Sequence, residues 1–119
     1  EQIHLFLDQD EVDEIWITFP DPFLRESKDK KRLTSSKFLD LYKKIIKKGG
    51  IVHLKTDSPV LYDFTLETLQ KYEGSNILYQ NDDIYASELA FKELEFKTYY
   101  EQEHLKAGKT IKYVRFTIN

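Results

Sequence analysis

The hydrophobic and polar positions of this chain alternate between strand-like and helix-like stretches. Residues 15–19 form a near-continuous apolar run of β-branched and aromatic side chains, which is typical of a strand buried on both faces. Residues 34–48 place apolar side chains at helical spacing and stop at Gly49 and Gly50, which predicts a helix. The pattern predicts further strands at 51–55, 77–79 and 110–118, and further helices at 59–72 and 98–106.

Two stretches have no clear period. Residues 1–10 mix apolar and polar side chains and are interpreted as a short helix or an irregular lead-in. Residues 87–97 fit either a helix or a mobile loop. The order of the remaining segments is strand, helix, strand, helix, strand, helix, strand. Strands that alternate with helices predict an α/β fold with a mainly parallel sheet and right-handed crossovers.

Two acids follow neighbouring predicted strands. Asp21 comes directly after the first strand and is bracketed by Pro20 and Pro22, while Asp57 follows the second strand. In such sheets, ligands bind beyond the carboxyl ends of the strands. We therefore expect both carboxylates at the same rim of the sheet.

Each acid also has an ordinary structural interpretation. Asp and Pro are common in turns, and the pattern favours a turn and a functional role for Asp21 about equally. For Asp57 the following Ser58 and Pro59 indicate helix capping, and only the neighbouring Asp21 favours a functional role.

The net charge of −3 hides a strong asymmetry. Residues 25–48 hold ten Lys and Arg against three acids, whereas the rest of the chain holds eight against eighteen. Charge runs are usually solvated surface. A basic patch on an acidic body beside a candidate site also fits a defined contact with phosphates. Five of its cations fall within eight residues: Arg25, Lys28, Lys30, Lys31 and Arg32.

Several classes of site and protein are not indicated by the sequence. It has no Cys, no long apolar run for a membrane span and no secretory signal pattern, so the cytoplasm is the expected compartment. His53 lies within a predicted strand and is expected to be a packed residue of the core or of a sheet face. The histidines lack metal-ligand spacing, so no metal site is expected. The glycines form no nucleotide-binding loop, so the main cradle of any nucleotide-like cofactor is expected upstream of residue 1.

Three stretches together resemble one family. They are Phe19-Pro-Asp-Pro22 with the basic segment that follows, Gly49-Gly50 with His53-Leu-Lys-Thr-Asp57, and Thr98-Tyr-Tyr-Glu101 with Gly108 and the last strand. Their order and spacing are similar to those of the bacterial tRNA (guanine-N(7))-methyltransferases across nearly the whole chain.

The resemblance implies a class I, Rossmann-like methyltransferase fold with a mostly parallel sheet and a final antiparallel strand. It implies that residues 1–119 are the C-terminal half of one domain, which alone is expected to be inactive. It also implies methyl transfer from S-adenosylmethionine to N(7) of a guanine in the variable loop of tRNA. The exposed edge of the partial sheet is expected to allow a homodimer.

The resemblance also assigns roles to individual residues. Asp21 matches the catalytic, cofactor-proximal aspartate, and Arg25 stands where the family has a substrate-contacting Lys. The substrate-binding matches are Asp57, Thr98, Tyr99, Tyr100 and Glu101. The RNA-contacting matches are Ser27, Lys28, Asp29, Lys30, Lys31 and Arg32. From the pattern alone, Tyr99 and Tyr100 could stack on a base, although packing within a helix is the expectation.

Two other interpretations remain open. One is a non-catalytic RNA-binding module or pseudo-enzyme that uses the same basic patch. The other is a plain α/β domain with a solvated basic face. A Gly-rich loop upstream, followed by an acid at the next strand end, favours the enzyme.

Overall fold

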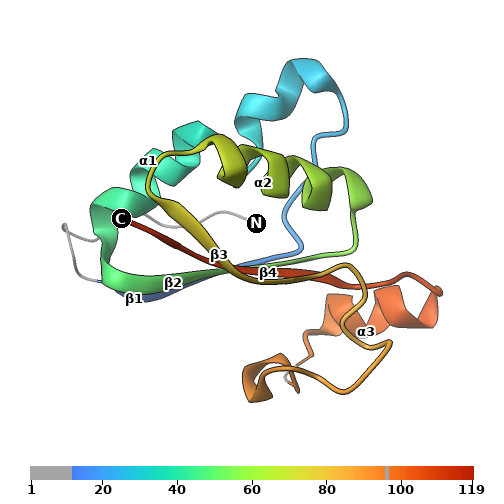
Figure 1. The fold of residues 1–119 in the computed structure, drawn as a ribbon. Helices are drawn as coiled ribbons and strands as arrows, with labels where there is room; N and C mark the ends of the chain where they lie inside the picture. The colour runs from blue at the N-terminus through green and yellow to red at the C-terminus, as the bar shows by residue number, and fades with distance from the viewer. Residues whose placement is uncertain (1–11, 96) are drawn as a thin grey trace.

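A computed structural model describes residues 12–95 and 97–119. The lead-in predicted at residues 1–10 lies outside the described residues. The segments follow the predicted order (Figure 1). They are β1 (Val12–Thr18), the 3₁₀ helix η1 (Glu26–Lys31), α1 (Ser36–Ile45), β2 (Ile46–Thr56), α2 (Pro59–Lys71), β3 (Ser75–Asn81), the 3₁₀ helix η2 (Lys92–Glu95), α3 (Tyr99–Lys106) and β4 (Lys112–Ile118). None of the described helices is long and apolar enough to cross a membrane.

The described strands form one sheet in the order β1-β2-β4-β3. β1 pairs with β2 in parallel, and β4 is antiparallel to both of its neighbours. β1, β2 and β3 therefore run in one direction, and the last strand runs against them. This confirms the predicted α/β class with a final antiparallel strand.

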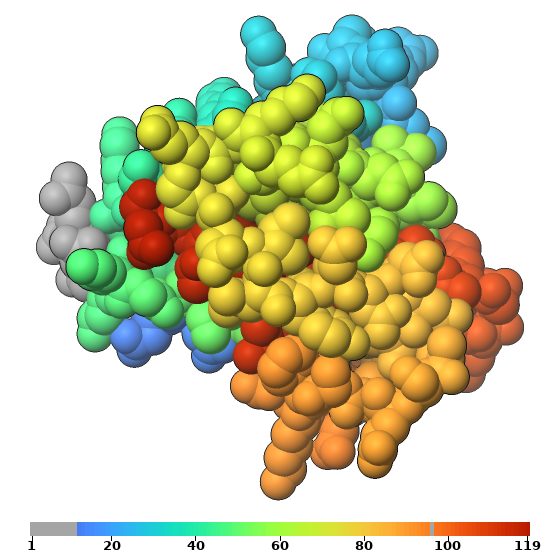
Figure 2. Space-filling view, viewed as in Figure 1, coloured from blue at the N-terminus to red at the C-terminus, as the bar shows by residue number. Residues whose placement is uncertain are grey.

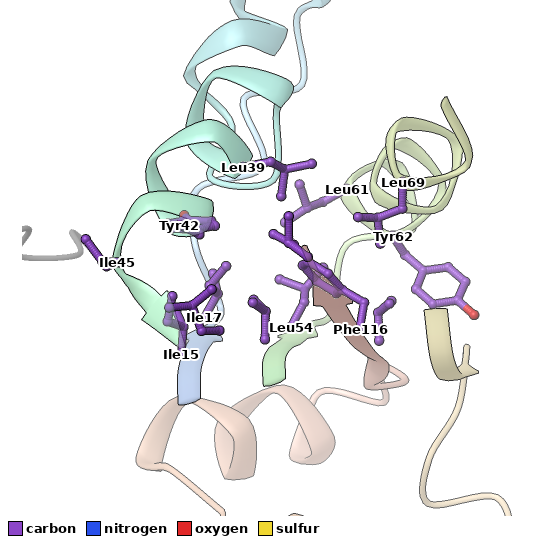
Figure 3. Close-up of a cluster of buried hydrophobic side chains, with 14 residues drawn as sticks. Ile15, Ile17, Leu39, Tyr42, Ile45, Leu54, Leu61, Tyr62, Leu69 and Phe116 are labelled. Carbon is purple, nitrogen blue, oxygen red and sulfur yellow. The ribbon is translucent and has the colours of Figure 1, made fainter. Parts of the chain in front are cut away.

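The main hydrophobic core lies between the sheet and two helices. α1 and α2 cover one face of the sheet, while η2 and α3 lie on the other (Figure 1). Side chains from α1 and α2 point toward the apolar face of the strands (Figure 3). Fully buried members include Leu39, Tyr42, Leu61, Leu54 and Phe116. Each buried leucine or phenylalanine side chain stabilises the fold by about 1.5–3 kcal/mol relative to exposure.

The prediction that the first strand is buried on both faces is wrong for the described part of the chain. Ile15 and Ile17 pack into the main core, but Trp16 between them is 36% exposed. Successive side chains of a strand point to opposite faces, and α1 and α2 cover only the face of Ile15 and Ile17. The face that carries Trp16 is the one that η2 and α3 cover in part.

The prediction that the first helix runs to residue 48 is also wrong. α1 ends at Ile45, and residues 46–56 are strand. Ile46 pairs with Val12 of β1 and is buried, so sheet pairing outweighs the local helical pattern. Gly49, at φ +81, lies where the register shifts between the strands, so the glycine pair forms an irregularity in β2 rather than a helix stop.

The start of α2 follows local chemistry as predicted. Ser58 caps α2, because its side-chain oxygen accepts a hydrogen bond from the backbone N–H of Leu61 at 3.1 Å. Thr98, which the sequence pattern places within the helix, instead precedes α3 and caps it in the same way, through the N–H of Glu101 at 3.1 Å. Of residues 87–97, the described part is irregular apart from η2.

A second, smaller hydrophobic cluster lies under the segment between β3 and β4. Its buried members are Ile84, Leu94, Ile111 and Tyr113. Phe19, at the end of β1, packs against this cluster. The chain between β3 and β4 is thereby fixed beside the end of β1.

Candidate functional site

The turn after β1 holds Asp21 in an exposed and conformationally unusual position. Phe19 and Phe23, on either side of Pro20-Asp21-Pro22, both have positive φ, at 51° and 44°. Bulky residues rarely adopt this conformation, and each instance costs of order 1–3 kcal/mol. Asp21 Oδ1 accepts a hydrogen bond from the Phe23 N–H at 2.9 Å, and the acid is exposed to solvent. The turn thus presents a carboxylate at the end of β1.

The basic segment lies next to this turn. In Figure 2 the region around η1 stands out from the body of the molecule. Its exposed residues include Arg25, Ser27, Lys28, Lys30 and Lys31, while Asp29 is half-buried. The exposed side chains of Lys28, Lys30 and Lys31 therefore form a cationic surface, hereafter the lysine surface.

Arg32 is placed differently from the lysine surface. It is buried, and its guanidinium donates hydrogen bonds to the backbone carbonyls of Pro22 and Phe23. A direct contact between Arg32 and RNA, expected from the sequence, does not fit this buried position. The arginine instead holds the turn that carries Asp21.

The ends of β1 and β2 meet at one rim, as predicted from the pattern. Thr18 pairs with Lys55, and the Phe19 N–H donates to the Lys55 carbonyl at 2.8 Å. Asp57 follows β2 and shares an open hollow of about 640 Å³ with Pro22 and Leu24. The two acids therefore follow adjacent parallel strands at the same edge of the sheet.

Asp57 contacts α3 and the segment that follows it. Its Oδ2 lies 3.2 Å from Lys109 Nζ and 3.6 Å from His104 Nδ1. These contacts connect the end of β2 to the end of α3. Asp57 is thus positioned by Lys109 and His104, and it is not a capping residue for α2, where Ser58 has that role.

Glu101 is fully buried and holds Lys55. Lys55 Nζ lies 2.9 Å from Oε1 and 3.2 Å from Oε2 of Glu101, and both side chains are almost completely buried. The hydroxyl of Tyr85 also hydrogen-bonds to Glu101. Burial raises the pKa of Tyr85, and the bond to the Glu101 carboxylate raises it further. Glu101 therefore acts on the site through Lys55 rather than from its surface.

The expectation that Tyr99 and Tyr100 pack within the helix is wrong. They are 72% and 60% exposed, and their rings meet edge to face with centroids 6.0 Å apart. Because α3 is short and its buried side is occupied by Glu101, both rings remain on the surface. Two exposed aromatic faces are available for stacking.

A second hollow lies on the face of the sheet away from α1 and α2. It measures about 400 Å³ and is lined by Trp16, Thr18, Lys55, Glu93 and Thr98. It thus joins the ends of β1 and β2 to the start of α3.

Behind this hollow lies a row of hydrogen-bonded polar side chains. Arg115 Nε donates to the Tyr113 oxygen at 2.7 Å, so the Tyr113 hydroxyl can donate to His53 Nδ1, also at 2.7 Å. His53 Nε2 then donates to Glu14 at 2.6 Å, which fits a neutral imidazole. Burial lowers the pKa of His53, although the hydrogen bond that His53 donates to Glu14 opposes this. The His53 ring stacks on Trp16 with centroids 3.7 Å apart, which confirms its prediction as a packed residue of the sheet face.

With this geometry established, the chain can be compared with known proteins. A family model described as "Putative methyltransferase" matches residues 1–114. The chain belongs to this methyltransferase family.

Named relatives agree with this assignment. A tRNA (guanine-N(7)-)-methyltransferase of Christiangramia forsetii is 49% identical over 109 residues, which are 91% of this chain and 48% of that protein. Proteins of the same name from Porphyromonas gingivalis and Bacteroides fragilis are 46% and 41% identical over 98% and 99% of this chain, and over 47% and 46% of their own lengths. The resemblance predicted from three stretches is confirmed. The chain spans about half the length of the curated relatives it matches.

The methyltransferase family implies S-adenosylmethionine as the methyl donor. The exposed carboxylate of Asp21, at the end of a strand, fits the ammonium group of that cofactor, since an anionic acceptor pairs well with a cationic donor. Within the described residues, no group of three or more His, Cys, Asp and Glu could hold a metal ion.

Sequence reasoning missed three residues that line the second hollow: Trp16, Lys55 and Glu93. A charged residue within the apolar run 51–55 was a usable signal for Lys55, because buried lysines require a partner. Glu93 lies in the stretch without a clear period. No pattern linked it to the site.

Proposed function

We propose that the full-length protein transfers a methyl group to N(7) of a guanine in the variable loop of tRNA. Two findings support this: membership in the methyltransferase family and the names of the relatives. One structural observation carries the proposal for this chain. An exposed carboxylate at the end of β1 lies in a constrained turn between the lysine surface and the rim formed with β2.

The reaction needs alignment more than a strong base. Guanine N(7) has a lone pair in the plane of the ring, so no proton has to leave before attack. S-adenosylmethionine, when bound, supplies a methyl group that is already activated by its positive sulfur. The residues of this chain then contribute by holding the guanine in line and by excluding other orientations.

Asp21 is the proposed catalytic and cofactor-binding residue. Its carboxylate accepts hydrogen bonds from the cofactor ammonium group or from the guanine. The Phe23 N–H already occupies Oδ1 at 2.9 Å, which limits the rotation of the side chain. A fixed carboxylate suits a step that depends on geometry.

Substrate binding is proposed for the residues around β2 and α3. Asp57, on the rim, accepts hydrogen bonds from the guanine edge, while Thr98 lines the second hollow. Tyr99 and Tyr100 offer exposed rings for stacking on bases. Glu101 supports the site by holding Lys55.

The lysine surface and Arg25 are proposed to bind tRNA phosphates. They are exposed and lie directly after the turn with Asp21, so phosphate contacts here bring the target nucleotide toward the carboxylate. Ser27 and Asp29 belong to the same proposed contact segment. The cytoplasm and a homodimer remain predictions.

Methyl transfer by the full-length protein tests the proposal. Wild type is expected to transfer labelled methyl from S-adenosylmethionine to unmodified tRNA, with the label mapping to one guanine N(7). Asp21→Ala should abolish transfer and leave tRNA affinity largely intact, because the carboxylate does not belong to the lysine surface. Near-normal turnover by this variant contradicts its role. Residues 1–119 alone, as a comparison sample, are expected to be inactive.

Salt dependence tests the lysine surface separately. Replacing Lys28, Lys30 and Lys31 by Ala should weaken tRNA binding and reduce the slope of log affinity against log salt by about 2–3, since each phosphate contact contributes roughly one unit or less. Lys71→Ala, at the end of α2, is the matched control and should change neither. RNA binding without transfer by wild type favours the non-catalytic module, and no binding at low salt favours a plain α/β domain.

A further inference from the structure

Arg32 belongs to the basic segment by sequence but to the interior by structure. Its exposed fraction is 4%, whereas the lysine surface is exposed. A buried guanidinium is rare unless several acceptors surround it. Its role therefore follows from what it touches.

The guanidinium of Arg32 binds the chain directly after Asp21. Arg32 Nε lies 2.8 Å from the Pro22 carbonyl oxygen and 3.2 Å from that of Phe23, and Nη2 lies 2.8 Å from the Phe23 oxygen. The centre of the guanidinium lies 4.5 Å from the centroid of the Phe64 ring on α2. Arg32 thus connects the turn to a helix of the main core.

The turn needs such a support. Phe19 and Phe23 both have positive φ, which persists only where the surroundings enforce it. Phe23 contributes both the N–H that binds Asp21 and a carbonyl that Arg32 binds. We infer that Arg32 is a positioning residue, which fixes the Asp21 carboxylate through the Pro22 and Phe23 carbonyls and does not bind RNA phosphate. The expected effect of Arg32 on methyl transfer rests on the function proposed above.

The contacts explain why an arginine is needed. Its planar fork bonds two carbonyls at once while its face lies on the Phe64 ring. A lysine at this position keeps the charge but lacks both the fork and the flat face. The conservative substitution therefore separates a positioning role from a phosphate contact.

Kinetics of the full-length protein supply the first test. Arg32→Lys is expected to lower kcat on the order of 10²-fold, because small displacements of reacting groups carry such penalties. Its tRNA affinity should stay within about twofold of wild type, and the salt slope should not change. If Arg32 contacts phosphate, Arg32→Lys keeps most activity, and Arg32→Ala weakens binding and lowers the salt slope by about one. That result overturns the inference.

Phe64→Leu is a second variant that alters no charge. It removes the ring beneath the guanidinium and should lower kcat as Arg32→Lys does, but by a smaller factor. The slope of log tRNA affinity against log salt should not change. Lys71→Ala is again the surface control. A Phe64→Leu enzyme with wild-type kcat, alongside a normal Arg32→Lys enzyme, contradicts the positioning role.

Amide hydrogen exchange gives a readout that does not depend on activity. Exchange of the Phe23 N–H should be faster in Arg32→Lys than in wild type, while the β2 amides stay equally protected. Unchanged exchange at Phe23 overturns the inference. If wild type transfers no methyl to tRNA, the proposed function fails, yet this comparison still decides whether Arg32 fixes the turn.

Discussion

The two sides of the candidate site hold their acids by opposite means. On the β1 side, Asp21 is exposed and bonds the backbone N–H of Phe23 in a turn with two residues at positive φ. On the α3 side, Glu101 is fully buried and bonds Lys55 and Tyr85. One acid is presented to solvent by the backbone, and the other is enclosed by charged and polar partners.

This difference indicates that Asp21 serves ligand binding, whereas Glu101 serves the stability of the fold. An exposed carboxylate contributes little to folding and is free to bind a ligand. In a buried ion pair, each charge has lost its hydration and is compensated by its partner. Removing one partner is costly to stability, because the other charge is then buried without that compensation. We therefore expect the loss of the Glu101 carboxylate to affect mainly stability, and the loss of the Asp21 carboxylate to affect mainly turnover.

The largest expected effect on stability comes from Glu101→Ala. This change removes the carboxylate beside the buried ammonium of Lys55 and should lower the free energy of unfolding by about 3–5 kcal/mol. Denaturant unfolding of the full-length protein measures it. Glu95→Ala, on an exposed residue of η2, is the control and should stay within about 0.5 kcal/mol of wild type.

A double variant sharpens the test of Glu101. Combining Glu101→Leu with Lys55→Met removes both charges and should recover much of the loss, because apolar pairs of similar volume often replace buried ion pairs. A loss below about 1 kcal/mol for Glu101→Ala means that the pair behaves like a surface ion pair, and the contrast between the two sides then fails.

A smaller effect on stability is expected from a change in pH. It acts through His53, which lies on the same face of β2 as Lys55. Burial lowers the folded-state pKa of His53 below 6.5, and Arg115 lowers it further, while Glu14 and Glu93 oppose the shift. Below pH 6.5 the unfolded chain then binds more protons than the folded one. The contribution of His53 to the free energy of unfolding is therefore fully present above pH 6.5. It declines as the pH falls below 6.5, by at most about 1.4 kcal/mol per pH unit.

Comparison with His53→Gln isolates this titration from that of the carboxylates. Unfolding free energies measured between pH 7.5 and 5.5 should decrease more steeply for wild type than for the variant. Equal slopes contradict the assignment.

The parts predictable from sequence were those determined by neighbouring residues. Ser58 caps α2 because its side-chain oxygen reaches an N–H three residues ahead. The placement of Asp21 and Asp57 at one rim follows from the ends of two apolar runs and from the parallel pairing of their strands.

The parts that could not be predicted depend on contacts distant in the sequence. Lys55 meets Glu101 46 positions away, and nothing near Lys55 indicates that partner. Arg32 carries the same positive charge as its exposed neighbours, so the sequence does not distinguish it from them. Its burial depends on the carbonyls of the turn and on Phe64. Gly49 and Gly50 suit a helix end locally, but pairing with β1 extends β2 through them.

The smallest expected effect on stability is that of Asp21→Ala. The substitution removes one hydrogen bond at an exposed site, from the Phe23 N–H, and should lower the free energy of unfolding by about 0.5–1 kcal/mol. The same protein should have lost methyl transfer, so unfolding and activity measured on one preparation separate the two properties. A destabilisation as large as that of Glu101→Ala contradicts the division of the site, because Asp21 is then a structural residue of its turn and its loss of activity reports unfolding rather than chemistry.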